Sequence, residues 1–490
     1  MSTPAKCLGL VLLVSALIPE GSGPPTARPT RPPDAAALWE IDSAVDAMGG
    51  MARLRALRSL RLEGMREKAL LGVSADRRHP KAMFVEVSEL RDLSSGRALV
   101  HQRATLPMRP DPIPFTRATG GPGAPPTQRT ALALTPERIL FTARDADPKV
   151  GRDTVFDGRP ARVVRFGPEP VRLFLDADTH PPLGWMATLT YPDDPNEWGI
   201  WGDVRSATHW SDWSLEPDGL RYPRTVTEER NGLVSTRTTW SRVTPDAPVA
   251  EDSFPAPARS SAPAGAAGAS EDVRTLAPGV ALLCGSYNVL LVAGDDGVVV
   301  LDAPVSSERS RAVLDETRRR FPDRPVRALV LTSAVWPHVA GVRAYVARGI
   351  PVYAPAPAAQ VVRDLAAAPH CSHPDSLARA PRRADVRVVT DSVVIGGGAD
   401  RLVLLAPRLT AAPHAAAGLV AYLPERRILY AGDLLVPRRF EPNFWRQSWD
   451  ELRRLVAARG LPVLTVASLH DDPIPWSDVG EALDAGSPAP

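Results

Sequence analysis

One stretch of the sequence, from Pro255 to Ser270, constrains the fold more than any other. It reads PAPARSSAPAGAAGAS and contains no bulky apolar side chain that could contribute to a core. Such segments bury too little apolar surface to offset the entropy of ordering the chain, so they are typical of linkers. We therefore expect two domains, at residues 37–258 and 272–486, joined by a linker at residues 259–271.

Composition and charge narrow the class of protein. Hydrophobic residues make up 44% of the chain and charged residues 23%, which is typical of globular proteins. The formal net charge is +2, and no basic run or stripe accompanies it. The sequence therefore predicts no nucleic-acid partner.

The N-terminus has the pattern of an export signal. Lys6 is followed by an apolar run from Cys7 to Ile18, which Pro19 ends. As a helix this run would be ~18 Å long, too short for a ~30 Å hydrocarbon core. We therefore interpret residues 1–23 as a signal peptide and residues 24–36 as a linker. The mature protein is expected in the periplasm or outside the cell, with no transmembrane segment after the signal peptide.

The first domain combines a helical start with many strands. We predict a helix from Ala36 to Met48, stopped by Gly49-Gly50, and a short helical segment from Met51 to Leu57. Alternating apolar and polar residues from Leu60 onward indicate a strand. Further strands are predicted at Met83–Val87, Ala98–Ala104, Arg162–Phe166, Val171–Leu175 and Tyr222–Glu229. Because a helix is followed by many strands, we predict a curved antiparallel sheet wrapped on a helix.

This domain resembles the periplasmic lipoprotein-carrier family, which has a half-open β-barrel. The similar segments are Gly49-Gly50 before Leu54–Gly64, Phe174–Asp176 with Pro181–Leu183, Leu220–Pro223 and Asp252–Pro257. The resemblance implies binding of an apolar ligand such as a lipid. Seven of the eleven tryptophans fall in this domain; we interpret them as packing residues, with an apolar binding groove as the alternative.

The second domain alternates strands and helices. Predicted strands are Val280–Cys284, Asn288–Val292, Val298–Leu301, Val326–Leu331 and Pro351–Ala354. A helix capped by Ser306 or Ser307 runs to about Phe321, and a second helix ends at Gly349. Between them lies the loop Thr332–His338.

This order resembles the metallo-β-lactamase superfamily. The matching pieces are Asn288 with Gly294–Gly297 and Leu301-Asp302, the loop after Leu331, His414–Val420, Leu423–Asp433 and Ser468–His470. The resemblance implies an αββα sandwich with its active site at one edge. We therefore predict an α+β chain in which this sandwich follows an antiparallel, β-rich, half-barrel-like domain.

The same resemblance predicts a metal site that lacks several of the family's ligands. In the family, the loop carries H-x-H-x-D-H, whose side chains converge on two zinc ions for hydrolysis. Here Ser333, Val335 and Pro337 stand at three of the ligand positions, and only His338 remains. Two zinc ions are therefore not expected.

Residual ligands stand at the matching downstream positions. They are His414, Asp433 and His470, which with His338 leave a donor set suited to one zinc ion at most. Pro337 fixes φ beside His338 and could turn its imidazole away. The segment His370–Asp375, which includes Cys371, could supply replacement ligands, although a polar loop is the commoner explanation. No residue is assigned as catalytic.

Three functions remain open. The leading hypothesis is an exported metallo-β-lactamase-fold protein without dinuclear hydrolase activity that acts as a binding or scaffold module. The second is a mononuclear zinc hydrolase using His338, Asp433 and His470. The third is an envelope carrier of lipid or lipoprotein through the N-terminal domain. A small molecule or a lipid is open as ligand, no protein partner is indicated, and Cys284 and Cys371 could pair or stay free.

Overall fold

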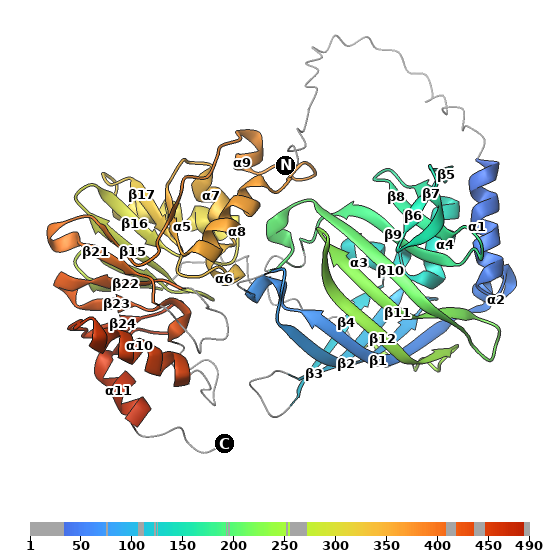
Figure 1. Cartoon of the computed structure of the whole chain (residues 1–490), viewed down its shortest axis with the longest axis horizontal. Coiled ribbons are helices and arrows are strands. Elements are labelled where there is room, and N and C mark those ends of the chain that lie inside the picture. The colour runs from blue at the N-terminus through green and yellow to red at the C-terminus, as the bar shows by residue number, and fades with distance from the viewer. Residues whose placement is uncertain are drawn as a thin grey trace, which may run out of the picture.

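The computed structural model describes residues 34–74, 77–105, 112–121, 124, 126–192, 194, 197–250, 253–254, 272–407, 418–435 and 446–484. The predicted signal peptide, the linker at 259–271 and the candidate ligand His414 lie outside these residues. Figure 1 shows two side-by-side bodies, with the N-terminal strands on one side and the C-terminal sandwich on the other.

The N-terminal body is built on one large antiparallel sheet. Its twelve strands pair in the order β4-β3-β2-β1-β12-β11-β10-β9-β8-β7-β5, and β6 pairs with β7. Among the described strands, β4 and β5 end this path without meeting, so the sheet does not close into a barrel. The elements are α1 (Ala35–Ala47), α2 (Met51–Ala56), β1 (Ser59–Ala69), η1 (Leu71–Val73), β2 (Ala82–Asp92), β3 (Arg97–Thr105), β4 (Ile113–Gly120), α3 (Pro126–Ala133), α4 (Pro136–Asp145), β5 (Lys149–Val150), β6 (Thr154–Phe156), β7 (Arg159–Phe166), β8 (Val171–Asp176), β9 (Pro182–Leu189), η2 (Gly199–Trp201), β10 (Val204–Leu215), β11 (Arg221–Arg230) and β12 (Leu233–Pro245).

Local chemistry explains where the first helix begins and ends. The Asp34 side chain accepts hydrogen bonds from the backbone N–H groups of Ala36 and Ala37, so α1 starts one residue before the predicted position. Gly49 and Gly50 have φ of 117° and 88°, values that end a helix at little cost only for glycine. The first residues of α1 therefore lie inside the segment that the sequence assigned to the 24–36 linker.

The C-terminal body is a four-layer sandwich. One sheet pairs as β13-β14-β15-β16-β17-β18-β19 and the other as β20-β21-β22-β23-β24-β25. In Figure 1, α5, α7 and α8 cover the first sheet, and α10 and α11 cover the second. The elements are β13 (Val273–Ala277), β14 (Val280–Leu283), β15 (Val289–Gly294), β16 (Gly297–Leu301), α5 (Ser307–Arg320), β17 (Val326–Val330), α6 (Trp336–Val339), α7 (Val342–Val346), β18 (Val352–Ala354), α8 (Ala356–Ala367), α9 (Ser376–Arg379), β19 (Val386–Val388), β20 (Ser392–Ile395), η4 (Gly398–Asp400), β21 (Leu402–Leu405), β22 (Val420–Leu423), η5 (Pro424–Arg426), β23 (Ile428–Tyr430), η6 (Gly432–Leu434), α10 (Arg446–Ala458), β24 (Thr465–Ala467), β25 (Ile474–Pro475) and α11 (Trp476–Asp484).

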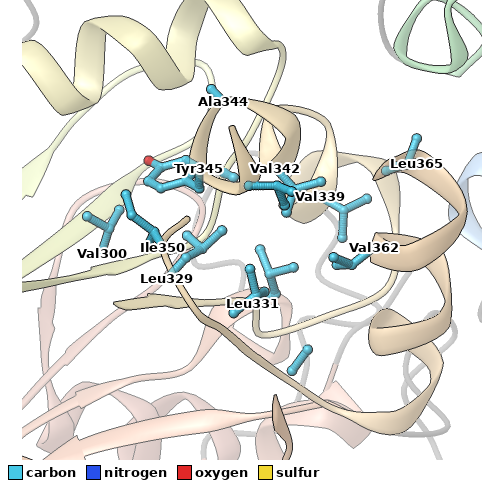
Figure 2. Close-up of a cluster of buried hydrophobic side chains, with 14 of the residues drawn as sticks. Val300, Leu329, Leu331, Val339, Val342, Ala344, Tyr345, Ile350, Val362 and Leu365 are labelled. Carbon is cyan, nitrogen blue, oxygen red and sulfur yellow. The ribbon is translucent and has the colours of Figure 1, made fainter. Parts of the chain in front are cut away.

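Strand β16 shows why this sequence makes four layers. All five of its residues are buried, so neither face of the strand can meet water. Val298 and Val300 pack into the cluster beneath the helices, whereas Val299 and Leu301 pack into the cluster between the sheets. Figure 2 shows the helix side of this arrangement, with Val300 below Tyr345. A strand apolar on both faces belongs inside a sandwich, and the predicted α+β class with a C-terminal αββα sandwich is confirmed.

Two features differ from the predicted elements. Helix α6 begins at Trp336, inside the segment predicted to be a loop, so His338 is presented from a helical turn. The hydrophobic cluster of the C-terminal helices also includes Leu71, Trp198, Trp201 and Val204 from the N-terminal body. The two bodies therefore share buried apolar surface. Within the described residues, no helix has the length and apolarity to cross a bilayer.

Candidate functional site

The candidate site lies where β17 and β23 end, and His338 is at its centre. Its side chain is fully buried. Nδ1 lies 2.9 Å from Thr332 Oγ1 and 3.1 Å from Asp302 Oδ1, and Nε2 lies 2.8 Å from Asp433 Oδ2. Both ring nitrogens of His338 therefore face carboxylates.

Asp302 contacts the Nδ1 side of the His338 ring. It is completely buried and has φ of 68°, an uncommon conformation for a residue other than glycine. Thr332 donates to it through its backbone N–H at 2.8 Å and its hydroxyl at 2.8 Å, and the Tyr430 hydroxyl donates at 3.0 Å. The sequence singled out Asp302 only as a strand end; its role as the anchor of His338 appears with the fold.

Asp433 joins the two described histidines. Its Oδ1 lies 2.9 Å from His470 Nε2, while its Oδ2 contacts His338. Asp433 follows Gly432, whose φ is 56° and where a Cβ would lie 2.6 Å from Thr332 Oγ1. Only glycine allows this approach, which places Asp433 between the histidines.

The charges of this cluster support one another. Burial alone would lower the pKa of His338, but Asp433 and Asp302 outweigh it and raise that pKa to about 10. Burial would raise the pKa of Asp433, but the charge and hydrogen bonds of His338 and His470 hold it well below its ordinary value. The cluster is thus an imidazolium between two carboxylates.

Tyr287 packs against this cluster, and Trp336 packs against Tyr287. The ring of Tyr287 lies 5.3 Å from the ring of His470 and 5.3 Å from that of Trp336, edge-on in both cases. A Cβ added to Gly72 of the N-terminal body would lie 3.2 Å from Trp336 Cδ1. The N-terminal body therefore reaches the loop that carries His338. The sequence did not indicate these contacts, because they join residues far apart in the chain.

The side chains at the three positions predicted to have lost a ligand are packed inside the domain. Ser333 is 4% exposed and Val335 1%, and Pro337 is also buried. Valine and proline side chains carry no donor atom, and a neutral serine hydroxyl is a poor partner for zinc, which binds Cys, His, Asp and Glu. These three positions do not fit a dinuclear centre.

The described donor side chains point toward one another. Each histidine directs Nε2 at its own oxygen of Asp433. Across the described part of the chain, which leaves out His414, no group of three or more His, Cys, Asp or Glu side chains is arranged to hold a metal ion. The structure thus brings together three of the four predicted residual ligands in an ion-pair arrangement.

The segment His370–Asp375 makes contacts of a different kind. Asp375 binds Arg343, with Nε at 2.7 Å and Nη2 at 2.9 Å. The backbone N–H groups of Cys371 and Ser372 donate to Asp203 of the N-terminal body. Cys284 is a free cysteine, so Cys284 and Cys371 do not pair with each other.

Comparisons with known proteins address the C-terminal domain. The family model described as "Metallo-beta-lactamase superfamily" matches residues 282–470. Similar solved structures include the DIM-1 metallo-β-lactamase, at 12% identity over 44% of this chain and 96% of that chain, with a TM-score of 0.34. Another is a metallo-β-lactamase from Pontibacter korlensis, at 19% identity over 44% of this chain and 97% of that chain, also with a TM-score of 0.34. A third is FIM-1 from Pseudomonas aeruginosa in its mono-zinc form, at 16% identity over 44% of this chain and 94% of that chain, with a TM-score of 0.33.

A search of curated proteins found no match. The family assignment depends on the model match, whose limits coincide with the sandwich from β14 to the strand-end residue His470. The C-terminal domain of this chain belongs to the metallo-β-lactamase superfamily.

Proposed function

We propose that this chain is an exported protein whose metallo-β-lactamase-fold domain is a binding or scaffold module without dinuclear hydrolase activity. The observation that carries the proposal is the replacement of three ligand positions by the buried side chains of Ser333, Val335 and Pro337. Two zinc ions need a converging set of imidazoles and carboxylates, and this loop offers one imidazole.

The packing of the remaining imidazole is consistent with the same proposal. The His338 side chain is fully buried, and Asp302 and Asp433 contact its two ring nitrogens. The cluster acts in this proposal as a buried electrostatic lock that ties α6 to the ends of β16 and β23.

A mononuclear zinc hydrolase is the second candidate. The observation that favours it is the meeting of His338, Asp433 and His470 at one place, with Nε2 of both rings directed at the carboxylate. Two imidazoles and a carboxylate can hold a catalytic zinc ion, which supplies a hydroxide from bound water near neutral pH.

Zinc content separates these two functions. Full-length protein is loaded with zinc, dialysed and measured by elemental mass spectrometry beside the variants His470→Ala and His101→Ala. His101 is exposed on β3 and controls for adventitious binding to a surface imidazole. The proposal predicts well under one zinc per chain in all three proteins. One full equivalent that only His470→Ala removes would overturn it in favour of the mononuclear enzyme.

The envelope-carrier function stays a prediction for the N-terminal domain. Its test is native mass spectrometry of the intact exported protein, in which a co-purified lipid would support the carrier. In the described core of this domain, Arg91 is buried and donates to Glu89 at 2.8 Å and to Glu137 at 2.9 Å. The core is thus not wholly apolar, and a lipid chain would have to avoid this ion pair.

A further inference from the structure

The two bodies meet along a contact that the proposed function does not use. We call it the seam. From the N-terminal body it includes η1, Trp198, Trp201 and Asp203; from the C-terminal body it includes Trp336, α8 and residues 369–372.

Apolar side chains fill the centre of the seam. Leu71 is 1% exposed, Trp198 6% and Trp201 7%, and all three belong to the same buried cluster as Val362 and Leu365 of α8. Figure 2 shows Val362 and Leu365 on that helix beside Val339 of α6. Tryptophans this deeply buried against a second body are the kind of residue that dominates the free energy of stable interfaces.

A cation lies over the two tryptophans. The Arg77 guanidinium is 4.2 Å from the centre of the Trp201 ring and 5.7 Å from that of Trp198. Burial lowers the pKa of Arg77, and the carboxylates of Asp364 on α8 and of Glu197 oppose that shift. The Arg77 cation thus lies over the tryptophan rings, and the charge of Asp364 on the other body favours its ionised form.

Asp203 recognises the backbone of the C-terminal body. Its backbone N–H donates to Pro369 O at 2.8 Å, and its carboxylate accepts from the N–H groups of Cys371 at 2.5 Å and Ser372 at 3.2 Å. Asp203 is 6% exposed, so these charge-assisted bonds are shielded from water. They fix the orientation of the bodies, because they require one particular loop conformation.

Gly202 makes this approach possible. Its φ is 67°, and a Cβ there would lie 2.6 Å from the His370 ring. At the other end of the seam, Gly72 approaches Trp336, the residue between the substituted positions Val335 and Pro337. At Gly202 a Cβ would also lie 2.4 Å from Pro369 O, so the two backbones pack there without room for a side chain.

We propose that the N-terminal domain is the resident partner of the altered metal loop, so that the two domains form one permanently docked unit. Trp336, with Tyr287 beneath it, serves as a docking residue and not as part of a substrate cleft. The η1 turn packs against Trp336 of this loop. This inference goes beyond the proposed function, and the seam does not depend on whether the site holds zinc.

The test is whether the halves stay together once the chain is cut. A protease site is placed within residues 259–271 of the full-length protein, the linker is cleaved, and the product is run on size exclusion at micromolar concentration in EDTA and 0.5 M salt. We expect the cleaved halves of the unsubstituted protein to co-elute. Separation of these halves would overturn the proposal.

Three variants locate the contact. Trp201→Ala, Gly202→Ala and Asp203→Ala are each expected to release at least half of the N-terminal fragment after cleavage. Trp39→Ala is the matched control, because Trp39 is 60% exposed on α1, which Figure 1 places at the far end of the N-terminal body. It should co-elute fully. If all three seam variants keep the N-terminal fragment bound after cleavage, the free energy of docking comes from other residues. That result would refute the assignment of docking to the seam.

Hydrogen exchange of the uncut variants excludes simple unfolding. In Trp201→Ala, we expect exchange at residues 333–338 to rise about tenfold while strands β15 and β16 remain protected. Unchanged exchange at 333–338 would show that the loop does not depend on the N-terminal domain, and would refute the proposal. Because zinc plays no part in either measurement, these outcomes are independent of the zinc assay.

Discussion

The ion pair between the buried Arg343 and the part-buried Asp375 gives a stability prediction whose size can be worked out from the structure. The Arg343 side chain is 4% exposed and binds both oxygens of Asp375, at 2.7 and 2.9 Å. It also donates to the carbonyl of Leu365 at 2.6 Å, at the end of α8. Asp375 in turn accepts from Ala378 N at 2.8 Å and caps α9. The pair therefore holds the segment that carries the seam residues 369–372.

The magnitude follows from the pKa of Asp375. Burial would raise this pKa, but Arg343 and the Ala378 N–H lower it from 3.8 to about 2. At ~1.36 kcal/mol per pKa unit, the ionised carboxylate contributes about 2 kcal/mol to folding at neutral pH. Asp375→Asn should lose about that much. Arg343→Met should lose at least as much, up to ~3–5 kcal/mol, because the part-buried Asp375 carboxylate then has no cation beside it.

The lowered pKa of Asp375 determines how its contribution to stability changes with pH. A carboxylate with a depressed folded-state pKa contributes stability above pH 3.8, and that stability is lost as pH falls toward 2. Between pH 7 and pH 3, about 1 kcal/mol of the difference between the native protein and Asp375→Asn should disappear.

Urea unfolding followed by tryptophan fluorescence at pH 7, 5 and 3 measures these differences. Asp385→Asn is the control, because Asp385 pairs with Arg387 at the surface, where both side chains are about half exposed. It should change the free energy of unfolding by less than ~1 kcal/mol. Equal destabilisation by Asp375→Asn at pH 7 and pH 3, or none at pH 7, would refute the assignment of this energy to the ion pair.

Three further substitutions test the site and the core by thermal unfolding and urea denaturation. Gly432→Ala should destabilise by ~1–3 kcal/mol, because a Cβ there meets Thr332 Oγ1 and φ is 56°; a neutral result would show that the turn is not needed. Tyr430→Phe should lose ~1.5–3 kcal/mol through the missing hydrogen bond to the Asp302 carboxylate, and no loss would mean that Asp302 is satisfied without it. Leu329→Ala should lose ~2–5 kcal/mol by opening a cavity beneath the helices shown in Figure 2, and a loss below ~1 kcal/mol would contradict the packing.

Much of the fold could be predicted from local pattern. Ser306 caps α5 by accepting from Arg309 N, as the sequence indicated, and the alternation at Leu60 and Leu62 forms β1. These features depend on neighbours within a few residues. The helix α4 was not predicted, since its buried Glu137 has no place in an apolar stripe until Arg91, far away in sequence, neutralises it.

The candidate site likewise has features that could be predicted from the sequence and features that could not. His338, Asp433 and His470 were predicted as residual ligands, and the fold brings them together. Their direct pairing and the anchor at Asp302 were not predicted, because hydrogen bonds across a sandwich depend on which strand ends meet. The seam was not predicted for a related reason. The sequence pattern around Trp198 and Trp201 is the same whether these side chains pack inside their own sheet or against another body.

The sequence by itself determined which side chains of the loop Thr332–His338 can coordinate a metal, because the isopropyl group of Val335 and the pyrrolidine ring of Pro337 have no lone pair in any fold. Tertiary structure alone decided that His338 lies between two carboxylates and that Trp201 lies against the other domain. The physical reason is the distance over which each property is determined. Donor chemistry belongs to a single side chain, whereas burial and pairing depend on distances between residues that only the folded chain brings together.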